Sequence, residues 1–235
     1  MVAILVVVTI VLFVGADFIL QWVRARRSRA ARPLSISKAG VADLLLPTLQ
    51  PERFAMPGGL FFHRGHTWVN LLFSGQAKVG ADEFFQKLLG RADAVTLPPV
   101  GVEVKAGQPF VAFRQGHRTA TLPAPIDGVV CAVNTEAAKA PGMLQRDPYT
   151  RGWLVAIRPK DLTANIPHLM VGEKSLAWLK LELGRLHDFL RETLTMHQDA
   201  LVGVTAADGG LSADGLLERL DDERWEAFQS RFLTV

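Results

Sequence analysis

The sequence predicts an α+β protein that is mainly β, with an N-terminal transmembrane helix before the β domain and a helical tail after it. Three observations predict this class. Residues 2–23 are almost continuously apolar, residues 61–157 alternate apolar and polar side chains in short stretches between turn residues, and residues 176–190 repeat leucine at helical spacing. The chain accordingly has four parts: a transmembrane anchor (1–24), a basic juxtamembrane segment and linker (25–55), a β domain (56–160) and a helical tail (161–235).

The first segment has the length and composition of a membrane span. About 20 mostly apolar residues cross the roughly 30 Å of hydrocarbon in a bilayer, and residues 2–23 supply about that many. A cleaved signal peptide is disfavoured, because no basic residue precedes the apolar run and no small-x-small cleavage site follows it. Asp17 is ionisable and lies inside the run. We interpret it as lying near the interface or against a partner helix, with a functional role as the alternative.

Basic residues follow the apolar run and set its expected orientation. Residues 24–38 contain six Lys or Arg residues and no acid, whereas the formal net charge of the whole chain is only +3. The basic character is therefore local and does not indicate nucleic-acid binding. Because short Lys- and Arg-rich flanks stay on the cytoplasmic side, we expect a single-pass protein of the inner (cytoplasmic) membrane with its soluble domain in the cytoplasm. The expected membrane-interface residues are Trp22, Arg24, Arg26 and Arg27.

The β domain is predicted from alternation and turn residues. Segment 67–73 alternates and stops at Ser74-Gly75, which is a hairpin signal. Apolar residues of 81–89 recur at helical spacing, and Gly90 follows as a C-terminal cap. Further short strands are expected at 102–104, 109–114, 117–121, 128–134 and 153–157. Strands of this length and spacing predict a small sandwich or barrel with one inserted helix.

The tail is predicted to be a pair of helices. Leucines recur at intervals of three and four residues with charged residues between them, at Leu176, Leu179, Leu183, Leu186 and Leu190. A second helical stretch, 216–232, places Trp225, Phe228 and Phe232 on one side. We interpret the leucine stripe first as a packing face and second as a candidate partner face. The pair would pack on the β domain, on the membrane surface or on a partner.

Motifs within residues 66–160 resemble one known family. They are His66-Thr67-Trp68; Val79-Gly80-Ala81-Asp82 followed by Gln86, Leu89 and Gly90; Leu97-Pro98 followed by Gly101, Glu103, Gly107 and Phe110; Ala124-Pro125 followed by Gly128, Val133 and Asn134; and Asp147-Pro148-Tyr149 followed by Gly152-Trp153-Leu154. They cover about two fifths of the chain in order, and together they resemble the H protein of the glycine cleavage system. That resemblance implies a lipoyl/biotinyl-like hammerhead sandwich over residues 56–160.

The sequence departs from this family where the family carries its cofactor. By the resemblance, a lipoyl-lysine is expected at a hairpin tip eight residues before Pro125, and His117 occupies that position. No lysine occurs between Lys105 and Lys139, and Arg114 replaces the family's acidic neighbour. Lipoate is attached through an amide to a primary amine, which neither imidazole nor guanidinium can replace. We therefore expect no lipoyl group, and the sequence indicates no other cofactor.

Three residues of this hairpin, Arg114, His117 and Arg118, form a candidate interaction tip. It could bind an anionic group or make a proton-linked contact; the alternative is a tip without a role, since Gln-Gly-His-Arg is also an ordinary hairpin turn. His63 and His66 have the spacing of some metal ligands, but no third ligand lies nearby, and no metal site is expected. No acid/base pair, phosphate loop or nucleophile elbow is recognisable, so the sequence predicts no enzyme and identifies no small-molecule substrate.

These observations predict a non-lipoylated, membrane-anchored scaffold or docking subunit of a larger membrane-associated complex, with other subunits of that complex as partners. One alternative is a periplasmic adaptor of the secretion or efflux type with a lipoyl-like domain. The arginines after the span and the His-x-Trp and Asp-Pro-Tyr motifs disfavour it. The other alternative is a carrier or enzyme component that uses the hairpin tip in a non-lipoyl way.

Overall fold

The computed structural model describes residues 49–195 and 213–234. The predicted span, its interface residues Trp22, Arg24, Arg26 and Arg27, and residues 25–48 of the linker lie outside these residues. Within the two described ranges, no helix is both long enough and apolar enough to cross a membrane.

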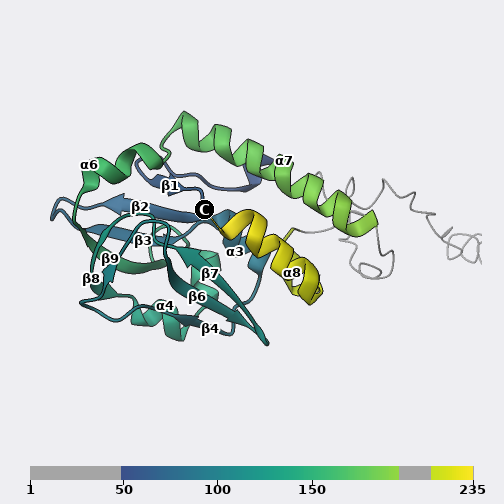
Figure 1. Cartoon of the computed structure of the whole chain (residues 1–235), viewed down its shortest axis with the longest axis horizontal. Coiled ribbons are helices and arrows are strands. Elements are labelled where there is room, and N and C mark those ends of the chain that lie inside the picture. The colour runs from purple at the N-terminus through teal and green to yellow at the C-terminus, as the bar shows by residue number, and fades with distance from the viewer. Residues whose placement is uncertain (1–48, 196–212, 235) are drawn as a thin grey trace, which may run out of the picture. The chain divides into compact units, whose positions relative to one another are not determined.

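Among the described residues, nine strands form two antiparallel sheets (Figure 1). The six-stranded sheet has the order β1-β2-β3-β9-β8-β5, and the three-stranded sheet has the order β4-β6-β7. This arrangement is the mainly β sandwich that the sequence predicts as one of two possibilities. The strands are β1 (Phe61–His63), β2 (Thr67–Leu71), β3 (Ala77–Ala81), β4 (Ala94–Thr96), β5 (Glu103–Val104), β6 (Pro109–Gln115), β7 (Arg118–Pro123), β8 (Gly128–Val133) and β9 (Trp153–Pro159).

Helices occupy the connections and the tail. The α-helices are α3 (Glu83–Leu89), α4 (Thr135–Lys139), α5 (Gly142–Arg146), α6 (Leu162–Asn165), α7 (Glu173–Thr195) and α8 (Asp222–Phe228). Three short 3₁₀ segments, η1 (Pro51–Arg53), η2 (Ile166–His168) and η3 (Leu216–Arg219), and a π-helical turn, η4 (Gln229–Leu233), complete the described elements.

The predicted inserted helix is present as α3, two residues shorter at its start. Asp82 is its N-cap, and Asp82 Oδ1 accepts a hydrogen bond of 2.8 Å from the backbone N–H of Phe85. The helix ends at Gly90, whose φ of 75° suits glycine. Residues 81 and 82 are therefore not helical, because Ala81 still pairs with Thr67 in the sheet.

The hairpin signal at Ser74-Gly75 is confirmed, because β2 pairs antiparallel with β3. The sequence pattern does not give the bounds of strands β1, β3 and β4, and it does not predict helices α4, α5 and α6. Strands β1 and β4 have three residues each, which is too short for alternation to be recognised. Strand β3 is buried along almost its whole length, so it lacks a polar face. At Gly80 a Cβ would lie 2.5 Å from the ring of Trp68, and only glycine lets that ring cover the strand without displacement.

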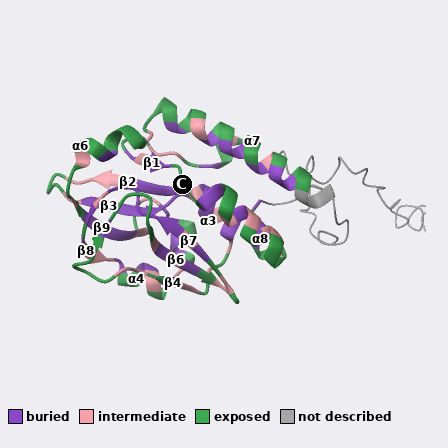
Figure 2. Ribbon diagram, in the orientation of Figure 1, coloured by how far each residue is buried: buried purple, intermediate pink, exposed green. Residues whose placement is uncertain are grey.

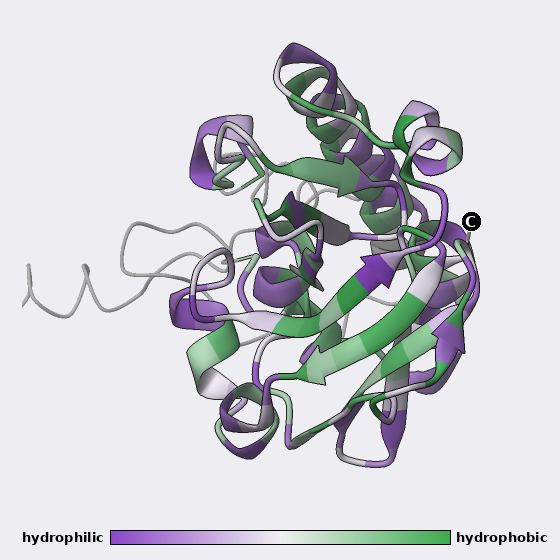
Figure 3. Ribbon diagram, turned by 90° about the vertical axis from the view of Figure 1, so that its left-hand side faces the viewer, coloured by the Kyte–Doolittle hydropathy of each residue, from purple (hydrophilic) through white to green (hydrophobic). Residues whose placement is uncertain are grey.

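The tail is part of the main hydrophobic core. One buried cluster joins Phe85 of α3, Phe113 of β6, Leu186 of α7 and Phe228 of α8. A second cluster lines the six-stranded sheet, with Val79 as one of its members. Figure 3 shows the apolar strands and the mixed character of the helices around them. Of the three expected positions for the tail, packing on the β domain is the one that the described residues adopt.

The candidate partner face on α7 is corrected by this packing. Leu179, Leu183, Leu186 and Leu190 are at most 4% exposed within the chain itself, so they are not available to a partner. Only Leu176, in the first turn, is exposed. Figure 2 shows α7 with one buried and one exposed face, as its spacing predicts.

The second tail helix differs in extent from the expectation. The segment 216–232 is not one helix, because η3 ends before Asp221, which caps the start of α8 by accepting from the N–H of Arg224 at 2.9 Å. Its three aromatic side chains are nevertheless buried together, as predicted: Trp225, Phe228 and Phe232.

Candidate functional site

The hairpin between β6 and β7 presents His117 at its tip. Gln115 and Arg118 are the last paired residues, so Gly116 and His117 form a two-residue turn. Gly116 has a φ of 60° and His117 does not have a positive φ, which is typical of a type II′ hairpin turn with glycine first. The His117 side chain is 74% exposed. The structure thus places His117 at the predicted apex.

A carboxylate from the tail contacts both basic residues of the tip. Asp222 Oδ1 lies 2.8 Å from His117 Nε2 and 2.8 Å from Arg118 Nε. Hydrogen bonds from His117 and then from Arg118 lower the pKa of Asp222, so it stays ionised. Because Asp222 is largely exposed, water screens these contacts, and they orient the tip more than they stabilise the fold.

Arg118 is the member of the tip that is fixed most firmly. Its guanidinium lies over the ring of Trp225, 5.5 Å from the centroid, and its Nη1 donates to the carbonyl oxygen of Leu217 at 3.4 Å. Arg114 is exposed on β6, opposite Thr119, and makes none of these contacts. The candidate interaction tip is therefore two residues plus Asp222, with Arg114 standing apart.

A shallow pocket of about 390 Å³ lies beside the turn. Several of its polar groups are already engaged: Glu218 accepts from the N–H of Arg91 at 2.7 Å, Asp93 accepts from the N–H of Gly116 at 2.7 Å, and Gln115 Nε2 donates to the carbonyl oxygens of Leu89 and Arg91. These bonds connect the hairpin to the end of α3 and to η3. The pocket therefore holds the tip in place and offers a ligand few free groups.

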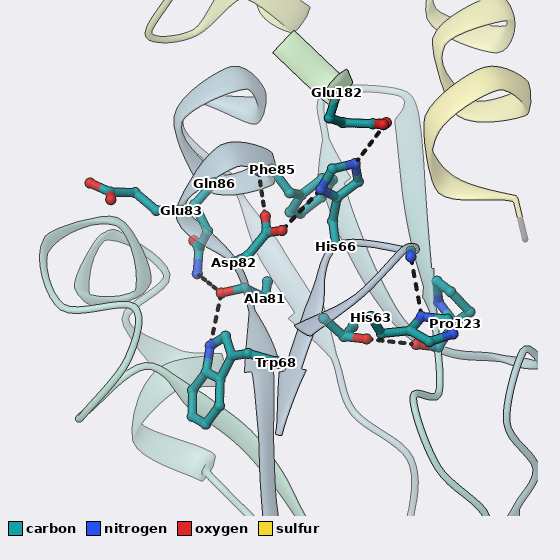
Figure 4. Close-up of polar contacts among 12 residues, drawn as sticks. His63, His66, Trp68, Ala81, Asp82, Glu83, Phe85, Gln86, Pro123 and Glu182 are labelled. Carbon is teal, nitrogen blue, oxygen red and sulfur yellow. Dashed lines mark hydrogen bonds and ion pairs between the residues drawn. The ribbon is translucent and has the colours of Figure 1, made fainter. Parts of the chain in front are cut away.

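A buried ion cluster connects the tail to the β domain (Figure 4). His66 is fully buried; its Nδ1 lies 3.0 Å from Asp82 Oδ2, and its Nε2 lies 3.6 Å from Glu182 Oε1 of α7. Its ring stacks on Phe84 at 4.5 Å between centroids. Arg185 Nη1 donates to Glu182 at 2.8 Å. This imidazole in the β1–β2 turn thus contacts both the N-cap of α3 and helix α7.

The electrostatics of this cluster favour a charged imidazole. Burial alone would lower the pKa of His66, but the carboxylates of Asp82 and Glu182 outweigh it and raise the pKa to about 9. The pKa of Glu182 is correspondingly lowered: its own burial opposes the shift, and contacts with His66 and Arg185 outweigh that opposition. His66 also has a φ of 59°, an uncommon conformation for a non-glycine residue, which the surrounding contacts hold in place.

Other motif residues are likewise structural. Trp68 Nε1 donates to the carbonyl oxygens of Ala81 and Pro148, each at 3.1 Å. The Tyr149 hydroxyl accepts from the N–H of Glu83 at 3.0 Å and donates to the carbonyl oxygen of Ala55 at 2.6 Å. Two distant segments, the His-x-Trp and Asp-Pro-Tyr motifs, are therefore fastened around the start of α3.

The two closely spaced histidines do not share a site. His66 belongs to the ion cluster, whereas His63 lines a separate pocket beside η2. No group of three His, Cys, Asp or Glu side chains within residues 49–195 and 213–234 is arranged to hold a metal ion. Sequence reasoning finds His66 and Asp82 through their motifs, but it misses Glu182 and Asp222, because no local pattern signals that either one pairs with a histidine.

The two sheets, the β6–β7 hairpin and the motif residues that brace α3 define a lipoyl-type domain of the kind the motifs imply. The glycine cleavage H-protein family model matches residues 60–181, about half of the chain. The chain belongs to this family. The match ends one residue before Glu182, so most of α7 and all of α8 lie beyond it.

Curated relatives and one solved structure are similar to part of this chain. The chain is 34% identical over 132 residues to a probable glycine cleavage system H protein of Pyrococcus horikoshii, a match that covers 56% of this chain and 98% of the relative. It is 35% identical over 112 residues to the glycine cleavage system H protein of Opitutus terrae, covering 46% and 88%. A solved glycine cleavage system H protein from Mycobacterium marinum aligns with a TM-score of 0.47 and 27% identity, covering 53% of this chain and 98% of that one.

Proposed function

We propose that this chain is a non-lipoylated H-protein-like docking subunit of a membrane-associated complex. The observation that carries the proposal is the state of the hairpin tip. A histidine stands where the resemblance places the carrier lysine, and Asp222, from beyond the family match, contacts it at 2.8 Å. A carrier arm must swing freely between partners, whereas this tip is tethered to the chain's own tail.

The tail gives the domain a surface that the matched region alone does not have. Helices α7 and α8 bury four leucines and three aromatic residues against the β domain, so they are a permanent extension of it. The exposed faces of the tail and of the tip are therefore fixed in position relative to each other. A fixed composite surface suits a docking role better than a mobile carrier role, because no ordering cost is added on binding.

The docking proposal predicts that other subunits co-purify with the full chain. Gentle detergent extraction of a tagged chain should bring down a defined set of proteins. Replacing the exposed His117 with alanine should reduce that set, since His117 is the outermost residue of the tip. The matched control is Arg158→Gln, an exposed change on β9, which should leave it intact. A chain that purifies alone, or an unchanged set for His117→Ala, would argue against docking through this tip.

We further propose that residues 2–23 anchor the chain with the domain in the cytoplasm. Support comes from the arginines at 24, 26 and 27, which follow the apolar run without any basic residue before it. A phosphatase reporter that works only after export, fused after Val235, should therefore be silent. Changing Arg24, Arg26 and Arg27 to glutamine should raise its activity by weakening the asymmetry. Strong activity of the unaltered fusion would place the domain on the other side.

A further inference from the structure

A second pocket, remote in sequence from the hairpin tip, combines a cavity with a cluster of basic groups. It has a volume of about 640 Å³, within the range of small-molecule sites. Its basic lining residues come from the end of β1 and the turn that follows it, from η2 and from the first turn of α7. They are His63, Arg64, His168 and Lys174.

The buried member of this cluster, His63, has one nitrogen left for a ligand. It is 6% exposed, and its Nδ1 accepts a hydrogen bond of 3.1 Å from the backbone N–H of Gly65. Burial first, and then the charges of His66, His168 and Arg64, lower the pKa of His63 to about 4, so the ring is neutral at neutral pH. With Nδ1 acting as acceptor, the proton is on Nε2, which is a hydrogen-bond donor.

The other ionisable side chains that line the pocket are all basic. Arg64, His168 and Lys174 are exposed to solvent at the pocket, and no acid lines it within the part of the chain that the structure describes. Asp127 contacts two of the lining residues: it accepts hydrogen bonds from Asn165 Nδ2 and from the N–H of Ala106, each at 2.9 Å. Its role is to hold two segments of the rim together. The pocket therefore has positive character.

The remaining lining is apolar and suits the body of a small molecule. Pro125, Pro167, Leu169 and Met170 contribute carbon surface to the same cavity. An inorganic anion would fill only a small part of about 640 Å³. We infer that this pocket binds a small organic phosphate, with its phosphate at His63, Arg64 and Lys174 and its organic part on the apolar wall. Guanidinium and ammonium groups together with an N–H donor are the usual partners of phosphate oxygens.

The test is calorimetric titration of the full chain in neutral detergent with phenyl phosphate as the probe. Binding should be measurable and should weaken about tenfold in Arg64→Gln and in Lys174→Gln, because each removes a charged contact. His63→Asn should weaken it as well: asparagine retains an acceptor for Gly65, but its amide donor is on a shorter side chain and does not reach the position of Nε2. Lys180→Gln, an exposed change on the same helix, is the matched control and should bind like the unaltered chain.

Two further arms identify the source of the phosphate. Inorganic phosphate should bind more weakly than phenyl phosphate, since it makes no use of the apolar wall. Phosphatidylglycerol added to the micelles tests a lipid headgroup: stronger binding than to phenyl phosphate, lost in Arg64→Gln, would assign the site to lipid phosphate. Absence of phenyl phosphate and phosphatidylglycerol binding, or equal affinities in Arg64→Gln, Lys174→Gln and Lys180→Gln, would overturn the inference.

Discussion

Replacing Leu186 with alanine is expected to lower the free energy of unfolding by about 2–5 kcal/mol. Leu186 is fully buried in the cluster that joins α7 to α3, β6 and α8, so the change removes apolar contacts and leaves a cavity. The effect should be this large although the residue lies beyond the family match, because the tail belongs to the same core. Urea unfolding of the full chain in neutral detergent measures it.

Leu181→Ala on the same helix is the matched control. Leu181 is 71% exposed, so its truncation should change the free energy of unfolding by no more than about 0.5 kcal/mol. Both changes remove the same atoms from the same helix and differ only in burial. If Leu186→Ala unfolded as readily as Leu181→Ala, the tail would be a loose appendage, and the fixed docking surface would lose its basis.

The second large effect is a stability maximum near pH 6.5, produced by two histidines with opposite shifts. In the folded state the pKa of His66 is raised from 6.5 to about 9. Its contribution is therefore complete below about pH 6.5 and is lost as the pH rises to 9, a change of about 3 kcal/mol. The pKa of His63 is lowered from 6.5 to about 4, so its contribution is lost as the pH falls from 6.5 to 4.

Asparagine at each position should remove one limb of this profile. His66→Asn suits the left-handed backbone of that residue and carries no titrating group, so it should lower stability at pH 6.5 and abolish the decline toward pH 9. His63→Asn should leave the alkaline decline and flatten the acid side. The lowered pKa of Glu182 adds a further loss below about pH 4.5. An alkaline limb that survives in His66→Asn would refute the assignment of the cluster.

Local patterns predict much of the fold because they record burial directly. The stripe of α7 is recognisable since leucine returns to one face every three or four residues, and β6 and β7 are recognisable from alternation around Gly116. Motif order predicts where His66, Trp68 and Asp82 belong. The bounds of strand β3 could not be predicted in this way, because the strand is buried on both sides and therefore shows no alternation.

The partners of the two key histidines could not be predicted. Asp222 is 105 residues from His117 in sequence, and only the packing of α8 beside the hairpin brings them together. Glu182 looks like one of many charged residues between the leucines of α7, yet it is 2% exposed and faces His66. Leu176 shows the reverse: it fits the stripe by spacing but remains exposed in the first turn of α7. Tertiary contacts, which a local pattern does not encode, determine the pairing of Asp222 and Glu182 and the exposure of Leu176.

We propose that this member of the family carries no lipoyl group. The resemblance places the carrier lysine at the position of His117, which has no primary amine, and Arg114 stands where the resemblance implies an acidic residue. Lys105 and Lys139, the nearest lysines on either side, lie outside the β6–β7 hairpin. Intact-mass measurement of the chain from its own cell, with a lipoate-specific antibody beside it, should give the unmodified mass and no antibody signal. Lipoate found on Lys105, Lys139 or any other residue would contradict the account and restore a carrier role.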